Sequence, residues 1–227
     1  MACVPSDHFV RCSFHVSGAN RGLGLELCRQ LAAGDVYSSI YAICRKSTRD
    51  LTALAKSANS KIQVLEDVEI TKDECVKVVQ DLFATNGRYP IPIHLLIHNA
   101  GAYGPPEDVS GPTSEDVSQT LENVTMERMR FALELNTLAP LRLTKALLPN
   151  LVAGSSANDP GKIAIITSLM GSVEQNGSGG HYGYRASKAA VNMVGKSLAV
   201  DLKDKNVAVC LGTYGVFCVC IRDMLTH

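Results

Sequence analysis

Short apolar runs alternate with longer stretches of helical periodicity along most of the chain. The runs are rich in β-branched residues, whereas the stretches between them repeat apolar side chains at three- and four-residue spacing. Such alternation is typical of βαβ units, in which helices cover both faces of a parallel sheet. We expect six strands, at residues 9–17, 39–44, 61–68, 93–98, 162–167 and 207–211.

The pattern also predicts where helices begin and bend. Thr71 and Glu74 form a capping-box pattern before an amphipathic stretch, and Asn86-Gly87 is a typical helix stop. A long helix is expected over 125–151, kinked just after Asn136 because Pro140 lacks a backbone N–H. Turn formers over 105–123 and 172–183 predict two mobile loops.

The length of 227 residues suits one α/β domain over 1–227. After the sixth strand, too little chain remains for a crossover and a seventh parallel strand. We therefore predict a Rossmann-like doubly wound parallel sheet of about six strands, an irregular tail over 212–227, and no seventh strand or substrate lid.

Composition excludes several classes of function. The chain has 22 basic and 22 acidic residues, so no charge bias points to nucleic acid. Its eight cysteines form no CxxC pair, and Cys218 and Cys220 lack the further ligands of a zinc site, so we expect reduced thiols and no metal. No apolar run suits secretion or a membrane span. We expect a soluble cytoplasmic protein.

A glycine-rich turn follows the first strand. It reads Ser17-Gly18-Ala19-Asn20-Arg21-Gly22-Leu23-Gly24 and leads into a helix. Glycines let a backbone approach a diphosphate closely, and a helix N-terminus offers free N–H groups, so this turn favours a dinucleotide. The spacing is GxxxGxG, and a plain strand-to-helix turn is the alternative.

Cations after the second strand bear on the choice of dinucleotide. Arg45 and Lys46 follow it, and Arg21 lies in the glycine turn. Cations attract a ribose 2′-phosphate, whereas an acid would accept hydrogen bonds from a 2′-hydroxyl. We therefore expect NADP(H) in preference to NAD(H), the alternative being a solvated pair of loop cations.

Other candidate residues follow later strands at the same expected sheet edge. Asp67-Val68 end the third strand, and Asn99-Ala100-Gly101 follow the fourth, where small residues leave room for a nucleotide. Ser168 follows the fifth, where its hydroxyl could donate to a carbonyl oxygen that gains negative charge. Each of these also suits an ordinary strand-ending turn.

Tyr184 and Lys188 stand four residues apart, on one face of an expected helix. A neighbouring ammonium favours the phenolate and should lower the tyrosine pKa, which suits proton transfer. One such pair often arises by chance. Neighbouring Tyr182 has no lysine four residues on, and His181 is more typical of a loop side chain.

The ordered set of glycine turn, Asn-Ala-Gly stretch, Asn136, Ser168, Tyr184 and Lys188 resembles the short-chain dehydrogenase/reductase family, and within it the carbonyl reductases similar to sniffer and C-factor. The resemblance covers about residues 12–210. It implies that Tyr184 is the general acid in reduction, that Ser168 polarises the carbonyl, and that Lys188 lowers the tyrosine pKa and contacts the nicotinamide ribose. Asn136 would hold a water linked to Lys188.

The resemblance has further implications. Asp67 and Val68 would flank the adenine, Asn99, Ala100 and Gly101 would line the adenosine ribose, and a homodimer would form through helices 125–151 and 184–202, whose apolar stripes could equally be core. The family's Pro-Gly turn after the sixth strand is replaced here by Tyr214-Gly215, or in another register by Gly212.

These observations predict an NADP(H)-dependent oxidoreductase acting on a small carbonyl or alcohol. One rival, suggested by the short ending, is a catalytically weak or inactive NADP(H)-binding or signalling protein, and a second is a nonfunctional truncated product. The sequence does not identify the substrate.

Overall fold

The structure, a computed structural model, describes residues 12–85, 89–105 and 119–213. Its main sheet has six parallel strands in the order β3-β2-β1-β6-β7-β8. The predicted α/β fold with a six-stranded parallel sheet is therefore confirmed. The strands are β1 (Cys12–Ser17), β2 (Ser39–Ile43), β3 (Ile62–Leu65), β6 (Leu95–His98), β7 (Gly161–Ile166) and β8 (Val207–Gly212).

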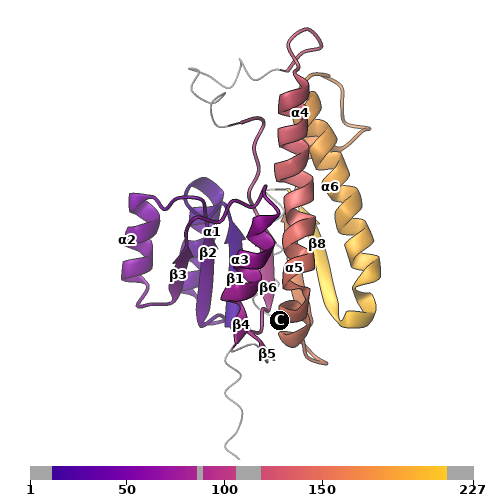
Figure 1. The fold of residues 1–227 in the computed structure, drawn as a ribbon. Coiled ribbons are helices and arrows are strands. Elements are labelled where there is room, and N and C mark those ends of the chain that lie inside the picture. Colours follow the sequence, from indigo (N-terminus) through magenta and orange to yellow (C-terminus); the bar gives the residue numbers. More distant parts are fainter. Residues whose placement is uncertain (1–11, 86–88, 106–118, 214–227) are drawn as a thin grey trace, which may run out of the picture.

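Helices cover both faces of this sheet (Figure 1). On one face, α1 (Gly22–Ala33) and α2 (Arg49–Ser57) bury Leu27, Leu31 and Leu51 in one apolar cluster. On the other face, α3 (Glu74–Leu82), α5 (Ala139–Ala153) and α6 (Tyr182–Asp201) contribute to a second cluster. Burial of apolar side chains on both faces explains why the central strands read as continuous apolar runs.

The long predicted helix is interrupted at Asn136. Helix α4 (Met126–Leu133) leads into a π-helical turn (Glu134–Leu138), from which α5 continues. In a regular helix the N–H of residue 140 would bond to the Asn136 carbonyl, but Pro140 has none. The Ala139 N–H bonds instead to the Glu134 carbonyl, five residues back. The predicted interruption is present, and its form is a widened turn.

The predicted capping box is wrong. Helix α3 begins at Glu74 after Asp73, whose side chain makes no cap hydrogen bond. The Thr71 hydroxyl donates to Glu69 Oε1 at 2.8 Å. Helix α3 ends at Leu82, while the predicted stop at residues 86–87 lies outside the described residues. A short antiparallel pair, β4 (Ala84–Thr85) and β5 (Tyr89–Pro90), was not predicted.

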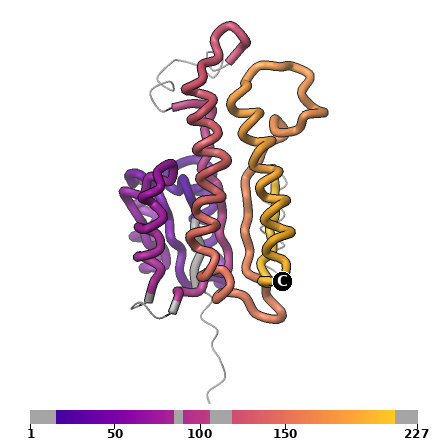
Figure 2. Tube along the Cα trace, turned by 45° about the vertical axis from the view of Figure 1, so that its right-hand side comes forward, coloured from indigo at the N-terminus to yellow at the C-terminus, as the bar shows by residue number. Residues whose placement is uncertain are grey.

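The two connected helices α4–α5 run beside α6 in both the ribbon and the tube view, and their upper ends rise past the sheet (Figures 1 and 2). Two single turns complete the described elements: a 3-10 turn (Leu169–Gly171) after β7 and another (Lys203–Lys205) after α6.

Several predicted features lie outside the described residues. They are Tyr214-Gly215 with most of the C-terminal tail, residues 9–11 of the predicted first strand, and residues 106–118 of the predicted loop over 105–123. Among the described helices, none combines the length and apolar character of a membrane span.

The sheet order creates a switch point between β1 and β6. From β1 the chain continues outward through β2 to β3, and from β6 it continues in the opposite direction through β7 to β8. In open α/β sheets such a point leaves a crevice at the carboxyl ends of the strands. The residues that follow β1 and β6 are therefore placed to form a ligand site.

Candidate active site

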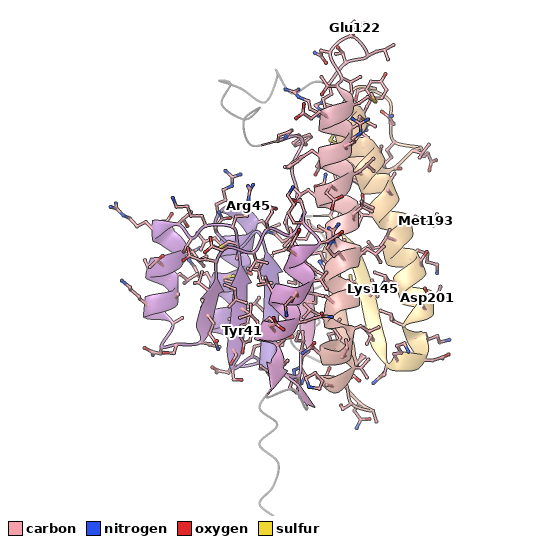
Figure 3. All side chains as sticks on the ribbon, in the orientation of Figure 1. Tyr41, Arg45, Glu122, Lys145, Met193 and Asp201 are labelled. Carbon is pink, nitrogen blue, oxygen red and sulfur yellow. The ribbon has the colours of Figure 1, made fainter. Side chains whose placement is uncertain are left out.

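The predicted site residues gather along the carboxyl edge of the sheet. Ser17 ends β1, Asn99 follows β6, and Ser168 follows β7. Figure 3 labels Arg45 at this same edge, beyond the end of β2. Helix α6 begins above the edge (Figure 1) and carries Tyr184 and Lys188, of which Lys188 bonds to the last residue of β7.

The glycine turn is held tightly against the sheet. The N–H groups of Gly18 and Ala19 both donate to the Ile43 carbonyl, at 3.1 and 3.3 Å. Gly18 has φ +69°, a left-handed conformation that glycine adopts without strain. A Cβ on Gly24 would lie 2.3 Å from the Gly18 carbonyl oxygen. The glycine turn and the first helical turn of α1 therefore lie closer together than any side chain at position 24 would allow.

Asn99 joins the ends of β1 and β6. Its Nδ2 donates to the Ser17 and Gly18 carbonyls at 2.9 and 3.2 Å. In return, Ser17 Oγ accepts hydrogen bonds from the N–H groups of Asn99 and Ala100 at 3.2 and 3.1 Å. These four bonds fix the glycine turn relative to the switch point. In this structure, Ser17 and Asn99 therefore support the shape of the site.

The residues predicted for the adenosine end lie around the ends of β2 and β3. Asn20 Nδ2 donates to the Lys46 carbonyl at 3.2 Å, and Thr48 Oγ1 donates to the Asn20 carbonyl at 2.6 Å. Arg45 is exposed, and its guanidinium lies 3.6 Å from the Glu69 carboxylate. Hydrogen bonds thus join the loop after β2 to the glycine turn, while the Arg45 guanidinium of this loop lies beside the Glu69 carboxylate.

Asp67 and Val68 form the loop that follows β3. Asp67 has φ +59°, and its N–H donates to the Arg45 carbonyl at 3.2 Å. The Val68 N–H donates to the Cys44 carbonyl at 3.3 Å, and its side chain is buried. The sequence placed residues 66–68 in the third strand, but the left-handed Asp67 turns the chain across the end of β2 instead.

Lys188 is buried beside the end of β7. Its Nζ donates to the Ile166 carbonyl at 2.8 Å and lies 5.6 Å from the centroid of the Tyr184 ring. Burial disfavours the ammonium form and lowers the Lys188 pKa to about 8. The predicted pair of phenol and amine on one helical face is therefore present, with the amine largely removed from water.

The pKa of Tyr184 is raised, contrary to the lowering expected from Lys188. Burial of the phenol is the largest cause, and the nearby Tyr103 adds to it. A hydrogen bond with Ser168 acts in the opposite direction and lowers the pKa. Desolvation of the phenolate therefore outweighs the hydrogen bond with Ser168 in this structure. The phenol stays protonated, as a proton donor requires.

Asn136 projects from the π-helical turn into the same site. Its Oδ1 accepts from the Ala102 N–H at 3.0 Å, while its Nδ2 donates to the Ala102 carbonyl at 3.0 Å and to Ser187 Oγ at 2.9 Å. A Cβ on Gly101 would lie 3.2 Å from Asn136 Oδ1 and 3.4 Å from Lys188 Nζ. The wide turn thus connects the segment after β6 to α6. A water held by Asn136 stays a prediction.

Sequence reasoning missed several residues of this site. Tyr103 stacks on Tyr184, with ring centroids 4.0 Å apart and an interplanar angle of 24°. Buried Gln119 donates from Nε2 to the Tyr103 carbonyl at 2.8 Å and accepts at Oε1 from the Gly183 N–H at 3.1 Å. An aromatic residue just after Asn-Ala-Gly could have been suspected, whereas no sequence pattern marks Gln119. Thr48 and Ser187 were also missed.

Comparison with known proteins agrees with this geometry. The family model for short chain dehydrogenases matches residues 14–220. The chain belongs to the short-chain dehydrogenase family. Its relatives include a 1-hydroxy-2-glutathionyl-2-methyl-3-butene dehydrogenase from Rhodococcus sp. (strain AD45), 32% identical over 86% of this chain and 74% of the relative. The C-signal protein of Myxococcus xanthus is 36% identical over 53% of this chain and 63% of its own length.

Solved structures of short-chain dehydrogenases have the same fold. A carbonyl reductase from chicken fatty liver with bound NADPH has a TM-score of 0.72 and 26% identity, covering 88% of this chain and 77% of its own. The Sniffer protein of Caenorhabditis elegans, whose structure is described as a carbonyl reductase, has a TM-score of 0.67 and 32% identity, covering 89% and 85%. The resemblance inferred from the sequence is therefore confirmed.

The glycine turn fits the nicotinamide dinucleotide that these relatives suggest. A Cβ placed on Gly22 would meet no atom within 4 Å, so the space in front of the turn is open. The first turn of α1 has no acidic residue, and its cap residue Arg21 makes no side-chain cap bond. A diphosphate would thus find free N–H groups and no opposing charge.

In the described part of the chain, no three His, Cys, Asp or Glu residues gather as metal ligands.

Proposed function

We propose that this short-chain dehydrogenase is an NADP(H)-dependent oxidoreductase that transfers hydride between the nicotinamide and a small carbonyl or alcohol substrate. The observation that carries the proposal is the convergence of Ser168, Tyr184 and Lys188. The first two share a hydrogen bond, and the amine of Lys188 lies 5.6 Å from the Tyr184 ring centroid. A carbonyl oxygen placed between the two hydroxyls would receive two hydrogen bonds.

In the proposed reduction, the Tyr184 hydroxyl donates the proton that the carbonyl oxygen gains. The raised pKa of Tyr184 keeps that proton in place near neutral pH. The Ser168 hydroxyl orients the carbonyl and stabilises negative charge on its oxygen. Lys188 holds a positive charge near the phenol, which favours loss of the proton as the phenolate forms. When bound, the nicotinamide supplies or accepts the hydride.

NADP(H) is proposed over NAD(H) because of the cations beside the adenosine end. Arg21, Arg45 and Lys46 are all exposed there. Arg45 is only weakly neutralised, since its contact with Glu69 is 3.6 Å long and both side chains are solvent-exposed. A 2′-phosphate could therefore displace Glu69 from Arg45. We propose that the nucleotide lies between these cations and the catalytic hydroxyls, with Leu23, Asp67, Val68, Ala100 and Gly101 along its path.

The test measures NADPH binding and NADPH oxidation with a panel of small aldehydes and ketones. Tyr184→Phe keeps the ring but removes the transferable proton. We expect it to bind NADPH as the native protein does and to lose turnover by at least roughly a hundredfold. Turnover by Tyr184→Phe at the native rate would overturn the assignment of Tyr184.

A second candidate function is that of a catalytically weak NADP(H)-binding signalling protein. The 36% identity to the C-signal protein favours it, because that relative is named for a signal. The same two measurements separate the candidates. Binding of NADPH without oxidation by any carbonyl of the panel selects the signalling protein, whereas NADPH oxidation that depends on Tyr184 selects the enzyme.

The assembly and location of the protein are also proposals. The π-helical turn, α5 and α6 carry exposed apolar side chains, including Leu138, Leu141 and Met193 respectively, which support a homodimer through these helices. Met193→Glu should then yield monomers in sedimentation, and an unchanged mass would contradict the dimer. The free thiols of Cys28, Cys44, Cys75 and Cys210 support a reducing, cytoplasmic location.

A further inference from the structure

Tyr103 covers one face of the Tyr184 ring. The two rings are nearly parallel, with centroids 4.0 Å apart. The Tyr103 hydroxyl donates to Met170 Sδ at 3.6 Å, and the His181 ring lies at a tilt, 5.6 Å from the Tyr103 centroid. The Tyr103 side chain is therefore held at both its face and its hydroxyl, although 40% of the residue surface is exposed.

The backbone around Tyr103 is tied to both elements that build the catalytic centre. On one side, Ala102 exchanges two hydrogen bonds with the Asn136 amide, each 3.0 Å long. On the other side, Gln119 links the Tyr103 carbonyl to the N–H of Gly183, the residue before Tyr184. Gln119 has no exposed surface, so its two bonds are shielded from water.

The link between Tyr103 and α6 also leaves little spare room. A Cβ on Gly183 would lie 3.1 Å from Gln119 Oε1 and 3.4 Å from Ala132 Cβ. The position of Gln119 therefore depends on glycine at the start of α6. Three contacts thus fix Tyr103 relative to Tyr184: the stacked rings, the Asn136 bonds and the Gln119 bridge.

We propose that Tyr103 is a positioning residue, whose ring holds the Tyr184 phenol in its reactive orientation and shields one face of it from water. This inference rests on the proposed function, because orientation matters only if Tyr184 transfers a proton. It assigns no contact between Tyr103 and the reacting atoms. Tyr103 acts through Tyr184.

The electrostatics of the site agree with this role. Burial and the presence of Tyr103 both raise the Tyr184 pKa. Among the described residues, the other groups that face the phenol are Lys188 from α6 and Ser168 from the end of β7, while His181 adjoins the outer ring of the stack. A smaller side chain at position 103 would admit water to the phenol. The pKa of Tyr184 should then fall toward its ordinary value.

Two variants at position 103 and one control test the proposal. Tyr103→Phe keeps the stacked ring and removes the hydroxyl, whereas Tyr103→Leu removes the ring. Tyr182→Leu is the matched control, because Tyr182 is 41% exposed and Tyr103 is 40% exposed. For each variant, kcat and KM are measured for one small aldehyde, together with the pH profile of kcat/KM for the alcohol. The ultraviolet titration of tyrosinate is compared with and without Tyr184→Phe.

We expect Tyr103→Leu to lower kcat by on the order of tenfold, with KM changed less than about twofold, and to shift the Tyr184 titration to lower pH. Tyr103→Phe should keep kcat within about threefold, and Tyr182→Leu should match the native protein. If Tyr103→Leu does not fold, Tyr103→Met replaces it in the same comparison.

Three results would overturn the positioning role: native kcat and native Tyr184 titration in Tyr103→Leu, an effect confined to KM, or an equal loss in Tyr182→Leu. Failure of the proposed function has a different signature, namely NADPH binding by the native protein without oxidation by any carbonyl. The tyrosinate titration needs no turnover, so in that case it still shows whether the Tyr103 ring shields the Tyr184 phenol from water.

Discussion

Lys188 donates a hydrogen bond of 2.8 Å from Nζ to the carbonyl oxygen of Ile166, the last residue of β7. This bond places the amine between α6 and the strand that leads to Ser168. Only 4% of Lys188 is exposed, and burial lowers its pKa from 10.5 to about 8. The site therefore holds a buried cation at a cost in stability.

The first prediction concerns Lys188→Met. A lysine pKa that is lower in the folded state destabilises the fold below about pH 8. This cost declines as pH rises toward the ordinary pKa of 10.5, because the folded amine loses its proton first. We expect Lys188→Met to abolish turnover and to raise the free energy of unfolding at neutral pH by about 2 kcal/mol. Urea unfolding at neutral pH and near pH 10 measures both effects, and a less stable variant at neutral pH would contradict the prediction.

The second prediction concerns acid stability and His98. This residue ends β6 in the core with 2% exposure, its Nε2 lies 2.9 Å from Thr144 Oγ1, and burial lowers its pKa from 6.5 to about 3. Below pH 6.5 the unfolded chain therefore binds a proton that the folded chain does not, so stability falls with pH by up to about 1.4 kcal/mol per unit until about pH 3.

His98→Gln tests this because an amide can keep a hydrogen bond to Thr144 without titrating. Between about pH 6.5 and pH 5, the native protein should lose about 2 kcal/mol more unfolding free energy than the variant. Urea unfolding at both pH values gives the difference. Equal losses in the two proteins would show that His98 does not set the acid sensitivity.

The third prediction concerns Arg45 and compares the binding of NADPH with the binding of NADH. Arg45→Glu should weaken NADPH binding by at least roughly tenfold and change NADH binding far less, because only NADPH carries the 2′-phosphate. Glu69→Gln removes the carboxylate that lies 3.6 Å from the Arg45 guanidinium. It should strengthen NADPH binding by about two- to threefold at low salt, with less effect at high salt. Equal changes for NADPH and NADH would contradict a contact between Arg45 and the 2′-phosphate.

The sequence was sufficient for the sheet and for the shared edge, because strands buried on both faces leave clear apolar runs. It also located the helix interruption, since Pro140 removes one identifiable hydrogen bond. It did not predict the π-helical form of this interruption, and the capping box that it did predict does not form. Thr71 bonds to Glu69 and not to Glu74. Which of these two nearby acidic residues becomes its partner depends on how the loop after β3 folds.

The missed parts of the site depend on contacts between segments far apart in the chain. Tyr103 and Tyr184 meet because hydrogen bonds to the backbone hold the segment around each of them in place. The Gln119 side chain makes two of those bonds, one to each segment. The direction of the Tyr184 pKa depends on the same packing. Sequence spacing showed a nearby cation, while the amount of water removed from the phenol became measurable only in the folded chain.

The last prediction compares two glycines, both in or beside α1. Gly24→Ala would place a Cβ 2.3 Å from the Gly18 carbonyl oxygen and 2.6 Å from Asn99 Nδ2. Backbone must then move, and the four bonds that join Asn99 to the glycine turn would be strained. We expect the variant to lose about 2 kcal/mol of unfolding free energy and most of its NADPH affinity.

Gly34→Ala is the matched control at the other end of α1. Its Cβ would have its nearest contact at 3.9 Å, and its φ of −87° suits any residue. Alanine restricts the unfolded chain, so stability should rise by about 0.5 kcal/mol with NADPH affinity unchanged. Thermal unfolding and NADPH titration of the two variants measure these effects. Equal NADPH affinity in Gly24→Ala and Gly34→Ala would mean that the close contact between the turn and α1 does not shape the nucleotide site.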